Sequence, residues 1–220
     1  STLSQEELSI LDELKEWNFY NDIDQSGPSI WTNWWDNLYD LVWDEFEVDQ
    51  MALKRPFTYQ TIHLLKTKED DTFMDIVDTP EKETATDLFL ISFKDAAKTI
   101  IEWESENGSY HWSDYKKTYV GHLLQGLPAF SRFNIPIGGG SGSVNATSRN
   151  HGPSWRMIVE MTSPPKALGI YPGGQSGNPG SKYYDNFIDH WANGDYHELI
   201  FMQSADQKEA VIGTQILKSN

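Results

Sequence analysis

Two stretches rich in glycine and serine are the places where this sequence could carry chemistry on loops. They cover residues 138–143 and 172–180. Consecutive glycines allow backbone at positive φ and the close approach of another chain or a ligand. The first stretch is not a phosphate loop, because no Gly-Lys-Ser or Gly-Lys-Thr ends it. Neither Ser141 nor Ser176 lies in a Gly-x-Ser-x-Gly elbow. We expect tight turns packed on a sheet for most of these glycines.

A group of acids and histidines near the end of the sequence is the candidate metal site. It consists of Asp185, Asp189, His190 and His197, but no recognised ligand spacing connects them. The sequence also contains no cysteine, which excludes disulfides, thiolate metal sites and a cysteine nucleophile. We therefore predict no metal and no cofactor in this chain.

The first half of the sequence has helical patterns that would position these loops. Ser4 and Glu7 form a capping-box pair ahead of an apolar stripe that ends at Trp17. A second helix is predicted with Ser29 as its N-cap, running through the aromatic stripe to Phe46. A third should stop near Gly108, and its start is left open between Pro80 and the Thr84–Asp87 pair.

The second half is predicted to hold strands. Residues 154–162 alternate like a strand, and further strands are expected at 167–171, 198–202 and 214–217. A helix capped by Ser181 is expected to run through Trp191 and end at Gly194. The predicted fold class is α+β, with residues 1–125 mainly helical and residues 126–220 forming a region of strands and glycine loops.

Composition narrows the classes of partner. The sequence has 17 basic and 33 acidic residues, a net charge of -16, which disfavours both nucleic acid and anionic membrane surfaces. No apolar run is long enough to cross a membrane. The nine tryptophans favour a large aromatic core, although a pocket for a sugar or an acyl group remains an alternative.

Two motifs in the second half resemble the penicillin acylase (penicillin amidase) family of N-terminal-nucleophile hydrolases. The first is the glycine loop that ends at Asn145-Ala146 and leads into His151-Gly152-Pro153-Ser154-Trp155-Arg156. The second is Gly174-Gln175-Ser176-Gly177 with the aromatic stretch that follows it. The resemblance implies the C-terminal part of a β chain that contributes to an αββα sandwich, and a hydrolase that cleaves N-acyl amides through an acyl-enzyme.

In that family the nucleophile is the N-terminal serine of the processed β chain, and its own α-amine serves as the base. This chain begins with Ser1, but a capped helix follows it instead of the expected Asn and apolar strand. The resemblance therefore places the nucleophile upstream of these residues, together with the family's early His, its oxyanion-hole Asn and its calcium ligands. We expect the chain alone to be inactive.

The candidate residues for a supporting role at the active site are Asn150, His151 and Arg156. The resemblance places a carboxylate that orients the early His near the start of the His-Gly strand, but Asn150 and His151 stand there. His151 could be a partner of the active site or a hydrogen-bonded structural residue. Arg156 is expected to be held by an ion pair.

The implied partners are the α chain, the N-terminal part of the β chain and a small acyl amide, such as a β-lactam amide or an acyl homoserine lactone. The chain alone should expose apolar surface and self-associate. The family also implies export to the periplasm or beyond. The alternative function is a tryptophan-rich module that binds glycans or another ligand without chemistry, which predicts exposed tryptophans.

Overall fold

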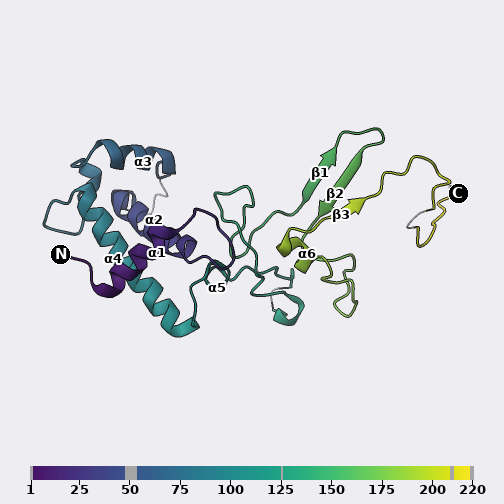
Figure 1. The fold of residues 1–220 in the computed structure, drawn as a ribbon, viewed down its shortest axis with the longest axis horizontal. Helices are drawn as coiled ribbons and strands as arrows, with labels where there is room; N and C mark the ends of the chain where they lie inside the picture. The colour runs from purple at the N-terminus through teal and green to yellow at the C-terminus, as the bar shows by residue number, and fades with distance from the viewer. Residues whose placement is uncertain (1, 48–53, 125, 209–210, 219–220) are drawn as a thin grey trace. The chain divides into compact units, whose positions relative to one another are not determined.

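The computed structural model describes residues 2–47, 54–124, 126–208 and 211–218 (Figure 1), and the chain forms two compact units. The first unit comprises Ser1–Gly121 and Ser131–His151, and the second comprises His122–Phe130 and Gly152–Asn220. The described residues form six α-helices and one three-stranded antiparallel sheet. The predicted α+β class is therefore confirmed.

The first unit is helical. Its elements are α1 (Gln5–Glu16), α2 (Gly27–Val42), η1 (Asp44–Glu47), α3 (Thr58–Thr67), η2 (Thr72–Met74), α4 (Ala85–Asn107) and α5 (Trp112–Lys116). The most extensive packing is between α2 and α4. Two apolar clusters form its core, one around Val42, Met74 and Leu88, and one around Ile30 and Ile100, all of which are fully buried.

The capping signals at α1 and α4 are confirmed. The Glu7 amide donates to Ser4 Oγ, and the Ser4 amide donates to the Glu7 carboxylate. Thr84 and Asp87 make the same reciprocal pair at the start of α4. The alternative start at Pro80 is wrong, because residues 80–84 stay outside the helix. Gly108 ends α4 at φ 80°, as its position predicted.

Helix α2 begins earlier than predicted. Its N-cap is Ser26 and Pro28 occupies the first turn, a position that proline favours because its fixed φ is already helical. Ser29 is therefore not the N-cap; it is fully buried inside the helix. Gly27 lies so close to the Trp17 side chain that a Cβ at this position would collide with it.

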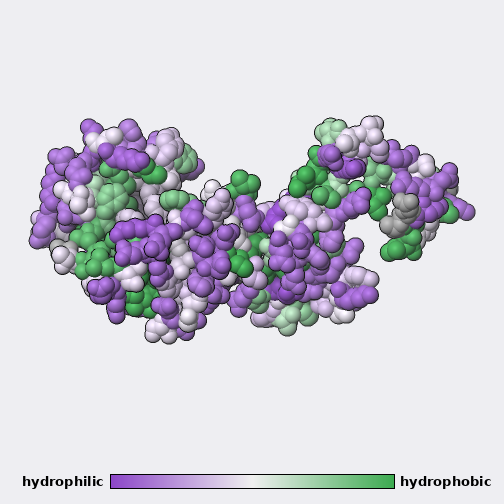
Figure 2. Space-filling view, in the orientation of Figure 1, coloured by the Kyte–Doolittle hydropathy of each residue, from purple (hydrophilic) through white to green (hydrophobic). Residues whose placement is uncertain are grey.

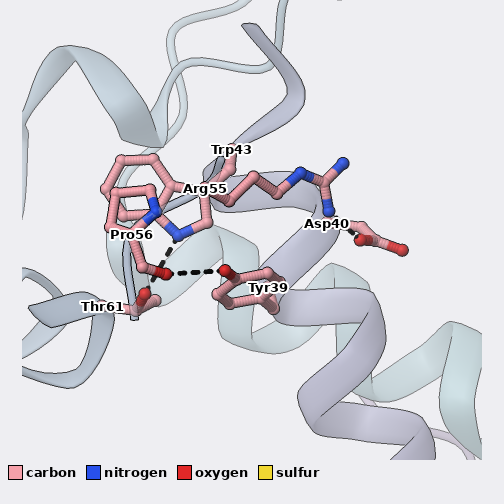
Figure 3. Close-up of polar contacts among 6 residues, drawn as sticks. All are labelled: Tyr39, Asp40, Trp43, Arg55, Pro56 and Thr61. Atoms are coloured by element: carbon pink, nitrogen blue, oxygen red, sulfur yellow. Dashed lines mark hydrogen bonds and ion pairs between the residues drawn. The ribbon is translucent and has the colours of Figure 1, made fainter. Parts of the chain in front are cut away.

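Polar contacts fix the start of α3 against the end of α2 (Figure 3). The Tyr39 hydroxyl donates to the Pro56 carbonyl at 2.6 Å, and Trp43 Nε1 donates to Thr61 Oγ1 at 3.0 Å. Arg55 forms an ion pair with Asp40 on α2. Sequence patterns did not predict α3, because residues 57–80 carry no clear periodicity; these contacts explain how it is held.

The second unit contains η3 (Pro128–Phe130), β1 (Arg156–Glu160), β2 (Lys166–Ile170), α6 (Ile188–Asn193) and β3 (His197–Leu199). The strands pair in the order β1-β2-β3, with Ile158 opposite Leu168 and Leu168 opposite Glu198. The first two predicted strands are confirmed within two residues at each end. The third is shorter than predicted and begins one residue earlier.

Two predictions in this unit are wrong. Residues 214–217 form no strand. Ser181 does not cap a helix, because its hydroxyl accepts from the Tyr183 amide at 3.2 Å in a turn, and α6 begins only at Ile188. The predicted end of that helix at Gly194 is confirmed, with φ 79°.

The sheet exposes apolar side chains on both of its faces. On β1, Met157 is 55%, Ile158 53% and Val159 41% exposed, although neighbours in a strand point to opposite faces. Figure 2 shows hydrophobic residues on the visible surface of this region. Helix α6 contributes the buried Ile188 and Trp191 to the unit's small core. Among the described helices, none is both long and apolar enough to cross a membrane.

Candidate functional site

The first unit contains an aromatic pocket of about 710 Å³. Tryptophans from three helices and a preceding loop line it, namely Trp17, Trp31, Trp35, Trp103 and Trp112, and Phe19 and Tyr115 add to its walls. Ligand sites are typically concave, mainly apolar and equipped with a few polar groups. This pocket has that character, so we describe it as the candidate site.

One wall of the pocket is a pair of stacked indoles on α2. The centres of the Trp31 and Trp35 rings lie 5.8 Å apart, and the ring planes make an angle of 20°. Residues four apart lie on the same face of a helix, so their side chains can stack in this way. Trp31 is 40% exposed, whereas Trp34 turns away to pack edge-on against Phe93 and donates from Nε1 to Ser92 Oγ. The pocket therefore has an open aromatic surface beside the core.

The polar part of the wall comes from residues 138–147, a loop that begins with the predicted glycine stretch 138–143. Gly139 has φ 82°, and its amide donates to the Asn21 carbonyl at 2.8 Å. A Cβ at Gly138 would lie 2.8 Å from that same carbonyl oxygen, and one at Gly140 would lie 2.6 Å from Asn21 Nδ2. Positive φ at Gly139 and the close approach of the Asn21 backbone to Gly138 thus favour glycine at these two positions, whereas Gly140 meets only the end of the Asn21 side chain.

Lys116, the last residue of α5, is a buried cation at the edge of the pocket. Only 7% of the residue is exposed, and burial lowers its pKa to about 8. Its Nζ donates to the carbonyls of Gly138 and Gly139 at 3.1 and 3.0 Å and to Thr147 Oγ1 at 2.7 Å. It also lies 5.2 Å from the centre of the Trp112 ring.

Asp36 on α2 is the pocket's acidic group. Asp36 is an exposed residue of the helix, and its pKa is raised, first by partial desolvation and second by the neighbouring Asp40 charge. The pocket thus combines aromatic walls, the backbone of a glycine loop, one buried amine and one acid whose pKa is raised. This set suits binding of an amphipathic molecule.

The structure places the three predicted site residues in two units. Asn150 and His151 belong to the first unit, both are exposed, and His151 Nδ1 lies 2.7 Å from Asn150 Oδ1. Arg156 begins β1 in the second unit. Its Nη1 donates to the Trp191 carbonyl at 2.7 Å, and its guanidinium lies 5.3 Å from the centre of the Trp191 ring.

The environment of Arg156 is that of a structural residue. Desolvation lowers the pKa of the Arg156 guanidinium, and the charge interaction with Tyr196 raises it by a smaller amount. Trp191 Nε1 also donates to the Pro153 carbonyl at 3.0 Å, so α6 is tied to the start of the His-Gly strand twice. The predicted supporting role at an active site remains a prediction for all three residues.

The second glycine loop, residues 172–180, is tied to the segment before α6. The Ser176 amide donates to the Tyr183 carbonyl at 3.0 Å, and the Phe187 amide donates to the Gly173 carbonyl at 3.0 Å. Gln175 exchanges hydrogen bonds with the Asn186 side chain. Gln175 thus fastens a tight loop through both its backbone and its side chain.

Two titratable residues of the pocket, Lys116 and Asp36, were not singled out by sequence. Lys116 stands in a Lys-Lys pair on a five-residue helix, a pattern typical of exposed surface. Only its i, i+4 spacing from Trp112 hinted that it packs on an aromatic ring.

Among the candidate metal ligands, His190 lies near Asp195 and beside His197. The described residues contain no group of three potential metal ligands.

Comparison with known proteins adds family information to this geometry. The model of the penicillin amidase family matches residues 2–208. The chain is similar to the acyl-homoserine lactone acylase QuiP of Pseudomonas syringae pv. syringae, at 30% identity over 169 residues that cover 69% of this chain and 20% of that protein. The enzyme of the same name from Pseudomonas syringae pv. tomato gives the same figures. The one from Pseudomonas aeruginosa is 26% identical over 170 residues, covering 66% and 20%. The chain thus spans about a fifth of the length of these relatives.

Proposed function

This chain belongs to the penicillin amidase family, a family of amide hydrolases, and from that premise we propose that it is part of an enzyme that hydrolyses N-acyl amide bonds. The observation that carries the proposal is the family match, which extends over residues 2–208. Because these relatives are named acyl-homoserine lactone acylases, we propose substrates in which an apolar acyl chain is joined to a small polar amine.

The proposed mechanism uses an N-terminal serine outside these residues. Its hydroxyl oxygen attacks the amide carbonyl while its α-amine takes the hydroxyl proton, and that proton then leaves with the amine product. Water hydrolyses the resulting ester and regenerates the serine. In support, residues 5–16 form helix α1 with Ser4 as its cap, not the strand that follows the nucleophile in the family. Ser1 itself lies outside the described residues.

We propose that the remainder of the enzyme covers the sheet of the second unit and builds the αββα sandwich with it. In support, β1 pairs on one side only among the described strands, and its residues are exposed on both faces. Strands with apolar residues on both faces are typical of buried positions in a sheet. Export to the periplasm is proposed on family grounds alone, and cell fractionation tests it.

A second candidate function is binding of an amphipathic ligand or a glycan in the aromatic pocket. It is favoured by the stacked, partly open Trp31 and Trp35 rings. Saturable quenching of tryptophan fluorescence by a sugar, lost in Trp31→Ala, is the expected result for a glycan module. The control variant is Trp34→Phe, because Trp34 packs on Phe93 in the core.

The test of the first proposal is hydrolysis by the intact protein that contains this chain. We expect release of the amine from long-chain N-acyl homoserine lactones and from a chromogenic phenylacetyl amide, and a mass increase of one acyl group on the nucleophile at early times. The ratio of kcat/KM for the homoserine lactone to kcat/KM for the phenylacetyl amide measures the substrate specificity. An intact protein that cleaves neither amide contradicts the proposal.

A further inference from the structure

The proposed amide hydrolysis does not explain why the amine of Lys116 is buried beside the glycine loop, residues 138–147. Burying an ammonium among neutral groups costs free energy unless a counter-charge compensates it. Within the described part of the chain, no carboxylate lies within ion-pair distance of Lys116. Its charge therefore faces only neutral oxygen atoms and the Trp112 ring.

Nor is Lys116 needed to satisfy the carbonyls that it contacts. The Gly138 carbonyl also accepts from Thr147 Oγ1 at 2.7 Å and from Asn145 Nδ2 at 3.2 Å. The Gly139 carbonyl also accepts from Trp112 Nε1 at 2.6 Å. Each carbonyl would remain hydrogen-bonded without the lysine, so the amine adds a constraint to groups that already have partners.

The three contacts of Nζ define a geometry. Two are adjacent carbonyls at the start of the loop, and the third is the hydroxyl of Thr147 at its end. A charged amine has three hydrogens, which match these three acceptors. The amine thus joins both ends of the loop to α5, while Trp112, one helical turn earlier, contacts the same loop start.

We propose that Lys116 is a positioning residue: its ammonium holds residues 138–147 in the single conformation that forms the polar wall of the aromatic pocket. Gly140, Ser143 and Thr147 of that loop line the pocket. The role is conformational specificity obtained at some cost in stability, as buried ionic groups provide in some proteins. The inference rests on the loop geometry and does not depend on the proposed hydrolysis.

The test separates loop order from global stability. Lys116→Met keeps an unbranched side chain of similar length in the space but removes the charge and the donors. We expect hydrogen exchange of the loop amides of Gly139, Gly140 and Ser143, which are hydrogen-bonded here, to accelerate about tenfold or more, equivalent to about 1.4 kcal/mol per factor of ten. The melting temperature of the 220-residue chain should stay within about 4 °C or rise.

Two further variants complete the experiment. Thr147→Val removes the third acceptor, and its effect on loop exchange should not add to that of Lys116→Met, because both break one unit. Lys117→Met is the matched control: its Nζ donates to Asn107 and lies over the Trp103 ring, away from the loop, so loop exchange should stay unchanged. Loop exchange unaffected by Lys116→Met, or changed equally by Lys117→Met, overturns the proposal.

Discussion

At the scale of single residues, the buried amine has a consequence for pH dependence. The pKa of Lys116 is about 8 in the folded chain, below the 10.5 of an ordinary lysine. Between these values the unfolded chain binds more protons than the folded chain, so this group's contribution to stability rises with pH over that window. Below about pH 8 the burial cost of the charge is fully present.

The unfolding free energy of the wild type should therefore increase relative to that of Lys116→Met as pH rises from 7.5 to 10. Urea denaturation at a series of pH values measures the difference. Other lysines and tyrosines also titrate at the upper end, but they are common to both chains and cancel. Parallel profiles for the two proteins would contradict the shifted pKa.

Gly139 is the glycine whose replacement should cost most in the loop. At φ 82° an alanine is strained, and its Cβ would collide with the Asn145 carbonyl oxygen. We expect Gly139→Ala to lower the unfolding free energy by about 1–3 kcal/mol. Gly142→Ala, where a Cβ meets open space, is the control and should leave stability nearly unchanged. Equal stability of the two variants would refute the loop geometry.

Sequence reasoning at this scale could identify the glycines but not what they pack against. Three successive glycines indicate special backbone, and the structure explains them by positive φ and by contact with Asn21, over 100 positions earlier in the chain. Lys116 and Asp36 could not be predicted as pocket residues, because their place in the pocket depends on the tertiary packing of α5 and α2. The roles of Asn150, His151 and Arg156 stay predictions.

At the scale of elements, local signals predicted helices well where side chains cap them. Thr84 and Asp87 make reciprocal bonds, which also hold the pKa of the Asp87 carboxyl below its usual value through hydrogen bonds from Thr84. The Pro80 and Ser181 predictions failed because each residue also suits a turn. The prediction of a strand at residues 214–217 was wrong, because a short apolar pattern forms a strand only where a neighbouring strand pairs with it.

The cap of α4 can be tested directly. Thr84→Ala removes the side-chain acceptor for the Asp87 amide and should lower the unfolding free energy by about 1 kcal/mol. Thr99→Ala is the matched control, because Thr99 is exposed in the same helix and bonds only the Asp95 carbonyl. Thermal or urea unfolding followed by circular dichroism measures both. Thr84→Ala unfolding like the wild type would argue against the cap.

At the scale of the whole molecule, the unpartnered sheet should govern solution behaviour. Ile158 and Met157 on β1 present apolar side chains to opposite faces, so the isolated chain should self-associate as its concentration rises. Ile158→Lys places a charge on one face and should shift the light-scattering mass toward that of a monomer. A wild-type chain that is monomeric at high concentration would speak against a covered sheet in the intact enzyme.

Fold class could be predicted from the helical and strand patterns, and the family from the glycine-loop motifs, because all of these are local in sequence. The division into two units could not be predicted. The second unit includes residues 122–130, which are separated from the rest of it by 21 residues of the first. The grouping of residues 122–130 with residues later in the chain depends on long-range contacts, and local sequence patterns carry no information about these.

The most direct test of the central claim is hydrolysis of a chromogenic phenylacetyl amide by this 220-residue chain alone, before and after chemical acetylation of its N-terminus. We expect no hydrolysis above buffer in either sample, whereas the intact protein should be active. Hydrolysis by the chain that acetylation abolishes would make Ser1 the nucleophile and contradict the proposed place of these residues in the enzyme.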